Sequence, residues 1–168
     1  MKIDHLDRLI LEALQIDADI THDALGIRLH TSAATCQRRI KRLRSIGAIE
    51  KTVAVVNPQA VGKPLIAVVE VTMTAQTDEV LLGFEALAAQ SSMVQQCYRV
   101  TTGPDFILVL AMPDMQAYHA LASALFSAVN EVRNVRTFFS VLRSKFSTEI
   151  PIGSSVTVMP PTLTMRPE

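Results

Sequence analysis

The segment from Thr21 to Ile49 constrains the fold most strongly, because its apolar residues recur at the spacing of two short helices joined by a tight turn. Thr21 and Ser32 are plausible N-caps of the two helices, and the apolar residues of the second helix follow at intervals of four and three. At about 100° per residue, the opposite face carries only small and cationic residues: Ala34, Arg38, Lys41, Arg42 and Ser45. Such a face suits contact with DNA phosphates and base edges. The segment therefore predicts a helix-turn-helix whose second helix reads DNA.

A third helix precedes this pair. Its apolar residues follow the pattern of one helix face, at Leu6, Leu9, Ile10, Ala13 and Leu14. Together the three helices can enclose a small core. The charge of the basic helix and the spacing of its apolar residues leave two other interpretations open. The charged face could simply be solvated, or the two helices could form an ordinary helical hairpin without DNA contacts.

Charge and composition narrow the class of protein. Formal charge is zero over 168 residues, but six cations and one acid lie between Arg38 and Lys51, which places a basic stripe on a neutral body. No apolar run reaches the roughly 18 residues of a membrane span, so we expect a soluble, cytoplasmic protein. Cys36 and Cys97 are isolated and predicted to be buried, reduced thiols. No metal-ligand spacing or catalytic motif is present, so neither an enzyme nor a cofactor is predicted.

The second half predicts a different architecture. After an extended, β-branched segment at 51–57 and a Pro/Gly loop to residue 64, strands are expected at 65–73, 93–102, 106–112 and 132–146, with helices from Asp78 and Asp114. The order βαββαβ is ferredoxin-like, and it leaves one apolar sheet face open for self-association or a ligand. The fold class is therefore α+β. The predicted domains are 1–50, a hinge strand and linker at 51–64, 65–150, and a Pro-rich tail at 151–168.

This arrangement resembles the leucine-responsive/asparagine regulator (Lrp/AsnC) family. The resemblance is carried by LDRLILEALQ, RRIKRLRSIGAIE, VNP, QQCYRV, PDMQAY and NEVRNVRTF. It implies a winged-type helix-turn-helix domain, a hinge strand, and homodimers that assemble to octamers around double-stranded DNA. It also implies a small effector, usually an amino acid, bound between C-terminal domains. His30-Thr31 stands where the family usually has Gly-Leu in the turn.

Residue roles follow from the helix face and from the resemblance. Base-edge contacts are predicted for Ser32, Ala34, Gln37 and Arg38, and phosphate contacts for Thr35, Lys41, Arg42 and Lys51. For Arg39, a DNA contact and an ion pair with an acid of a neighbouring helix are both open.

The resemblance also implies an effector site, predicted at Thr101, Thr102, Gly103, Asp105 and Thr137. An ionised aspartate can hold an α-ammonium group, while loop N–H groups and hydroxyls can bind a carboxylate. Two departures from the family pattern concern this site: the loop glycine is displaced by one position, and Val135 replaces a threonine. The other interpretation is that Gly103–Asp105 is only a β-turn.

These features predict a sequence-specific transcriptional regulator that responds to an effector. Two other functions stay open. One is a tetrapyrrole-modifying enzyme on the same scaffold, suggested by Tyr98 and Arg99. The other is a partner-binding module that has lost DNA binding, suggested only by the unusual turn at His30-Thr31.

Overall fold

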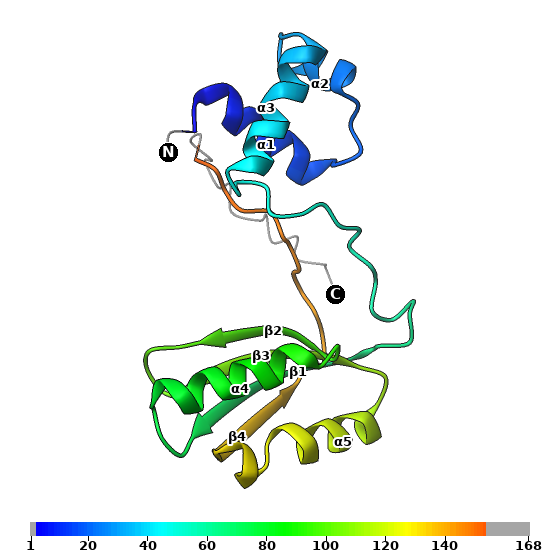
Figure 1. The fold of residues 1–168 in the computed structure, drawn as a ribbon. Coiled ribbons are helices and arrows are strands. Elements are labelled where there is room, and N and C mark those ends of the chain that lie inside the picture. Colours follow the sequence, from blue (N-terminus) through cyan, green and yellow to red (C-terminus); the bar gives the residue numbers. More distant parts are fainter. Residues whose placement is uncertain (1–2, 154–168) are drawn as a thin grey trace, which may run out of the picture. The chain divides into compact units, whose positions relative to one another are not determined.

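The structure is a computed structural model that describes residues 3–153. Within them the chain divides into two compact units, shown together in Figure 1. One unit contains residues 3–54 together with 146–153, and the other contains residues 55–145. We call them the helical unit and the sheet unit.

The helical unit is built from α1 (His5–Ile16), α2 (His22–Arg28) and α3 (Ala33–Ser45). Each helix starts at a side chain that accepts an otherwise unpaired backbone N–H of its first turn: Asp4, Thr21 and Ser32. The caps predicted at Thr21 and Ser32 are therefore confirmed. One buried stripe from each helix forms the core, which contains Ile10, Ala13, Leu25, Cys36, Ile40 and Leu43.

Three residues shape the turns at the two ends of α3. At its N-terminal side, Gly26 lies so close to the following turn that a Cβ there would be 2.8 Å from the Thr31 carbonyl oxygen. His30 adopts the left-handed conformation (φ 52°) in the same turn, which a histidine tolerates better than most residues. At the C-terminal side, Gly47 has φ 73°, and Ala48 N–H donates to the Leu43 carbonyl at 2.9 Å. This pattern is a Schellman motif, and it ends the helix.

The sheet unit has four antiparallel strands in the order β2-β3-β1-β4. Along the chain they are β1 (Leu65–Met73), α4 (Asp78–Gln90), β2 (Val94–Arg99), β3 (Phe106–Met112), α5 (Met115–Leu125), the short 3₁₀ helix η1 (Ala128–Asn130) and β4 (Val132–Phe139). The predicted ferredoxin-like βαββαβ fold is confirmed. Strand β1 is central, pairing Val69 with Leu108 on one side and with Thr137 on the other.

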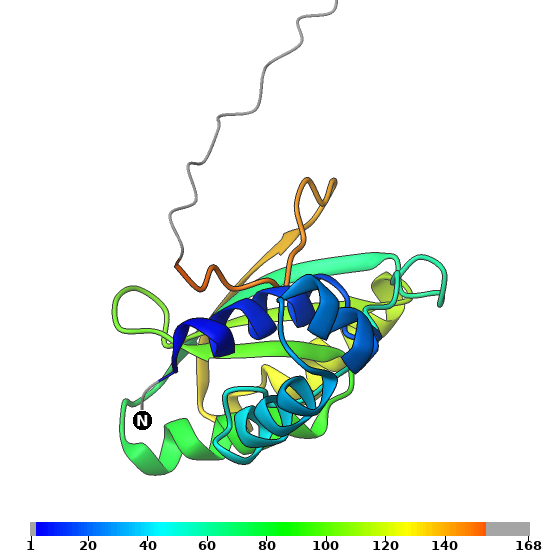
Figure 2. The same cartoon turned by 90° about the horizontal axis from the view of Figure 1, so that it is seen from above.

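Alternation along the central strands separates a covered face from an open one. Helices α4 and α5 cover the face that carries Val69, Val71, Leu108 and Leu110, and Phe84 of α4 packs on Phe106 with ring centroids 4.8 Å apart. The opposite face carries the partly exposed side chains of Ile66, Val68, Val109 and Phe138. The predicted open apolar face is therefore present. Figure 2 views the same elements from above.

Several predictions need correction. The hinge segment 51–57 forms no strand, and no wing strand follows α3 in residues 46–64. A strand requires a partner for its backbone N–H and C=O groups, and this single chain supplies none there. Strand β4 ends at Phe139 rather than at 146 because its partner β1 begins near that point. Cys97 is exposed, on the edge strand β2, and not buried.

The last described residues of the chain lie in the helical unit. Residues 146–153 group with the helical unit and not with the sheet unit, because Gln15 of α1 forms hydrogen bonds to Ile150. Most of the predicted tail, residues 154–168, lies outside the described residues.

Candidate DNA-binding surface and effector loop

Helix α3 presents the predicted reading face to solvent. Nine residues were considered for DNA contact: Ser32, Ala34, Gln37, Arg38, Lys41 and Lys51 are exposed, whereas Thr35, Arg39 and Arg42 are half-buried. Ser32 caps the helix, and its hydroxyl also donates to the Thr35 hydroxyl at 2.9 Å. Among the ion pairs of the described chain, none engages Arg38 or Lys41. These two cations are therefore available to an anionic partner.

A second set of cations on α3 is directed at α1. Arg39 pairs with Asp4 and lies 3.1 Å from Asp7 Oδ1, and Arg42 donates to Asp7 Oδ2 at 2.7 Å. The Asp7 side chain is fully buried, and it also accepts the backbone N–H of Asp4 at 3.1 Å in a reciprocal capping box. Of the two roles left open for Arg39, the structure contains the ion pair with helix one. Arg42, predicted to contact phosphate, also holds α3 against α1.

The electrostatics of this cluster favour ionised carboxylates. Burial alone would raise the pKa of Asp7, but hydrogen bonds from Arg42, from the Asp4 backbone and from Arg39 outweigh it and lower that pKa below 3.8. The pKa of Asp4 is lowered by its hydrogen bond with the Asp7 backbone and by Arg39. The two acids therefore stay charged at neutral pH and keep both arginines in place.

Sequence reasoning missed Asp7 and Gly26. The Asp4-x-x-Asp7 spacing resembles a capping box and could have indicated the cap, but the pairing with α3 depends on tertiary packing. Gly26 lies inside a helix, where glycine costs about 1 kcal/mol relative to alanine, and that cost is itself a sign of a close approach. Arg44, also exposed on α3, extends the basic surface.

The predicted effector loop, residues 100–105, connects β2 to β3. Thr101, Thr102 and Gly103 are exposed, and Gly103 has φ 93°, which a side chain would strain. Asp105 is only 6% exposed. Its carboxylate accepts the Met73 backbone N–H at 2.7 Å and the Gln76 side-chain amide at 2.8 Å. These donors belong to the end of β1 and the residues after it, so Asp105 anchors the loop to the sheet rather than closing a local β-turn.

Thr137, the fifth predicted effector residue, lies elsewhere. It pairs with Val69 in the middle of β1, and its hydroxyl is 2.7 Å from the Tyr118 hydroxyl of α5. Asp105 bonds to Met73, four residues further along β1, or about 13 Å at the rise of a strand. The single chain therefore brings four of the five predicted residues together in one loop and leaves Thr137 on the helix-covered face.

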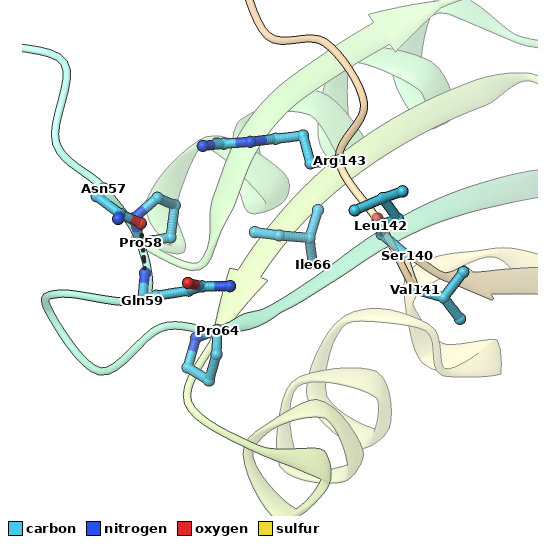
Figure 3. A pocket seen from close by; sticks show the side chains of 9 residues that line it. All are labelled: Asn57, Pro58, Gln59, Pro64, Ile66, Ser140, Val141, Leu142 and Arg143. Carbon is cyan, nitrogen blue, oxygen red and sulfur yellow. Dashed lines mark hydrogen bonds between the residues drawn. The ribbon is translucent and has the colours of Figure 1, made fainter. Parts of the chain in front are cut away.

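A pocket of about 270 Å³ lies elsewhere in the sheet unit, between the loop after Asn57 and the segment after β4. Figure 3 shows residues that line it, among them Asn57, Pro58, Ile66, Leu142 and Arg143. None of the predicted effector residues lines it.

Comparison with known proteins bears on both units. The family model for the AsnC-type helix-turn-helix domain matches residues 3–44, and the model for the Lrp/AsnC ligand-binding domain matches residues 66–150. The chain belongs to the Lrp/AsnC family. It is a transcriptional regulator with a DNA-binding helix-turn-helix domain and a ligand-binding domain. Family membership thus assigns DNA binding to the helical unit, whose helix α3 carries the exposed cations.

Similar proteins support this family assignment. The chain is 30% identical to the leucine-responsive regulatory protein of Salmonella typhimurium over 89% of this chain and 92% of that protein. The crystal structure of an AsnC family regulator from Agrobacterium tumefaciens matches with a TM-score of 0.82 at 30% identity, covering 88% of this chain and 96% of that one. A Neisseria meningitidis regulator, solved as a complex with L-Met, matches with a TM-score of 0.79 at 25% identity, covering 89% and 97%.

Residues 3–153 include no group of three or more His, Cys, Asp or Glu side chains placed to hold a metal ion. In the same range, no helix combines the length and the apolar character that crossing a bilayer requires.

Proposed function

We propose that this Lrp/AsnC regulator reads duplex DNA through Arg38, Lys41 and the first turn of α3, and that an amino acid adjusts its assembly or affinity. The observation that carries the DNA-reading part is the division of cations on α3. Arg39 and Arg42 are paired with buried or capping acids of α1, whereas Arg38 and Lys41 are exposed and carry no ion pair in the described residues.

The reading surface divides by chemistry. Arg38 can donate two hydrogen bonds to a guanine edge and Gln37 can pair with adenine, each worth about 1–3 kcal/mol of discrimination when bidentate. Lys41 and Lys51 meet phosphates, which position the protein without specifying sequence. Ala34 and Ser32 are small and exposed at the start of α3, so they permit close approach of the helix to the groove.

The effector proposal rests on the exposed loop of the sheet unit and on the relative solved with L-Met. Loop N–H groups and the hydroxyls of Thr101 and Thr102 can hold a carboxylate near Gly103. Asp105, because it is buried and already accepts two hydrogen bonds, acts mainly by fixing the loop to β1. Thr137 lies apart from such a site within one chain, since its hydroxyl is on the helix-covered face, 2.7 Å from the Tyr118 hydroxyl.

The open face of the sheet supports a homodimer. Val68 and Phe138 are 37% and 45% exposed on a face that also carries Ile66 and Val109. Monomeric proteins rarely leave such a contiguous apolar face uncovered, and a second copy would bury it. We propose that dimers formed in this way assemble further to octamers, and that the regulator acts in the cytoplasm, where DNA and amino acids are both present.

The test of the proposed function is a mobility-shift titration of the purified full chain with the DNA upstream of its own gene. The titration is repeated at two salt concentrations and with each amino acid in turn. We expect retardation that weakens as salt rises, because bound lysines and arginines release counterions from the phosphates. One or a few amino acids should change the affinity or the number of retarded bands.

Two outcomes would contradict separate parts of the proposal. Retardation indifferent to every amino acid would contradict the amino-acid effector and leave the DNA reading intact. Failure of Arg38→Ala to weaken specific retardation would contradict the assignment of the reading face. An Arg133→Ala variant, which removes one exposed cation from β4 of the sheet unit, provides the matched control for charge loss.

A further inference from the structure

The C-terminal segment after β4 returns to the helical unit and lies against α1. Gln15 Nε2 donates to the Ile150 carbonyl at 3.0 Å, and the Ile150 N–H donates to Gln15 Oε1 at 2.7 Å. One carboxamide therefore satisfies both backbone groups of one residue. Two turns earlier on α1, the Arg8 guanidinium lies 3.5 Å from the Gly153 carbonyl oxygen. Figure 2 shows the segment running beside α1.

The two contacts are spaced equally on α1 and on the C-terminal segment. Arg8 and Gln15 are seven positions apart, which places them on one helix face about 10 Å apart. Ile150 and Gly153 are three positions apart, also about 10 Å for an extended chain. Pro151 disfavours helical backbone at Ile150, and in an extended residue the N–H and C=O point to the same side. Gln15 thus pairs with Ile150 as a residue of a neighbouring strand would.

We propose that this face of α1 is a docking surface for the chain's own residues 147–153, and that the docked segment is a second tether of the DNA-binding unit. The first tether is covalent, through residues 50–57 after α3. The second begins at the end of β4, in the ligand-binding domain, and ends on α1. The helical unit is therefore connected to the sheet unit at two points, through the linker that follows α3 and through this segment.

This proposal depends on the proposed function in one respect only, namely that the helical unit binds DNA. The docking itself is testable without DNA or effector. Side-chain recognition of Ile150 predicts that its N–H is protected from exchange with solvent although the Ile150 side chain is 71% exposed. A residue this exposed would have no protection in the absence of a specific hydrogen bond.

The experiment is hydrogen exchange at the Ile150 amide in the full chain, compared among three proteins. Gln15→Ala removes both hydrogen bonds, and we expect exchange about tenfold faster, which corresponds to about 1.4 kcal/mol. Gln15→Glu keeps the acceptor and loses the donor, so its exchange rate should lie between. Ile16→Ala, an exposed neighbour at the same helix end, is the matched control and should leave the rate unchanged.

Three results would overturn the tether. The first is an unprotected Ile150 amide in the unmodified chain. The second is equal exchange in Gln15→Ala and the control. The third is protection that disappears on dilution, because it would assign the docked segment to another copy of the chain. Each of these results is independent of whether the protein binds DNA, so failure of the tether is distinguishable from failure of the proposed function.

Discussion

Helix α3 and the β2–β3 loop both carry predicted ligand-binding residues, but their charged side chains differ in how many are already paired within the fold. On α3, Arg39 and Arg42 are paired with Asp4 and Asp7 at the start of α1, while Arg38 and Lys41 are exposed and form no ion pair in the described residues. In the loop, the single carboxylate of Asp105 is already held by Met73 and Gln76. The cations of α3 outnumber those that form ion pairs with Asp4 and Asp7, so some stay exposed to another molecule. The one carboxylate of the loop is used within the fold. Arginine therefore forms ion pairs within the fold at Arg39 and Arg42 and stays exposed at Arg38.

The largest expected effect comes from removing the acid that holds α3. Asp7→Ala leaves Arg39 and Arg42 without their buried partner and breaks the capping box. We expect the helical unit to lose about 3 kcal/mol of unfolding free energy. Thermal unfolding followed by circular dichroism measures this loss. Glu50→Ala, which removes an exposed acid just beyond α3, should change stability by less than about 0.5 kcal/mol. Equal effects of the two variants would contradict the structural role of Asp7.

A pair of glycines gives a smaller contrast between the units. Gly26→Ala in α2 places a Cβ 2.8 Å from the Thr31 carbonyl oxygen, and we expect a loss of about 1–3 kcal/mol despite the better helix propensity of alanine. Gly83 lies in α4 with open space where its Cβ would be. There the same substitution should raise the unfolding free energy by up to about 1 kcal/mol. Chemical denaturation of both variants measures the two signs. A stabilised Gly26→Ala variant would contradict the close packing of the α2–α3 turn.

Acid should weaken the helical unit selectively. The pKa values of Asp4 and Asp7 are lowered in the folded state from 3.8, so the unfolded chain binds more protons near that pH. The stability that these ionised acids contribute is present above about pH 4 and is lost as the pH falls through their folded pKa values. Urea midpoints measured at pH 7, 5, 4 and 3 test this. The advantage of the unmodified chain over Asp4→Asn should shrink below pH 4, and a constant difference would contradict the paired carboxylates.

Local sequence signals predicted much of this structure. The 3.6-residue stripes predicted α1 and α3, period-two alternation predicted β1, and the caps at Thr21 and Ser32 followed from short-range chemistry. These features depend on neighbours within a few residues, so a single sequence contains the information that determines them.

The rest depends on distant partners. Arg42 lies on the exposed side of α3 by helical angle, yet its long side chain reaches Asp7, thirty-five positions earlier. The hydroxyl of Thr137 meets Tyr118, and Ile150 meets Gln15. No periodicity indicates such contacts. The predicted hinge strand at 51–57 failed for the opposite reason, since its sequence favours a strand but this chain alone provides no partner for its backbone.

The most direct test of the division on α3 compares two double variants for DNA affinity and for thermal stability. Arg38→Ala with Lys41→Ala should weaken binding to the upstream DNA by about 100-fold and leave the melting temperature unchanged, because neither side chain forms an ion pair in the described structure. Arg39→Ala with Arg42→Ala should lower the melting temperature, because Asp7 then stays buried without a cation. The reverse pattern, with stability lost in the first variant and retained in the second, would contradict the account. In that account Arg38 and Lys41 contact DNA, whereas Arg39 and Arg42 stabilise the packing of α3 on α1.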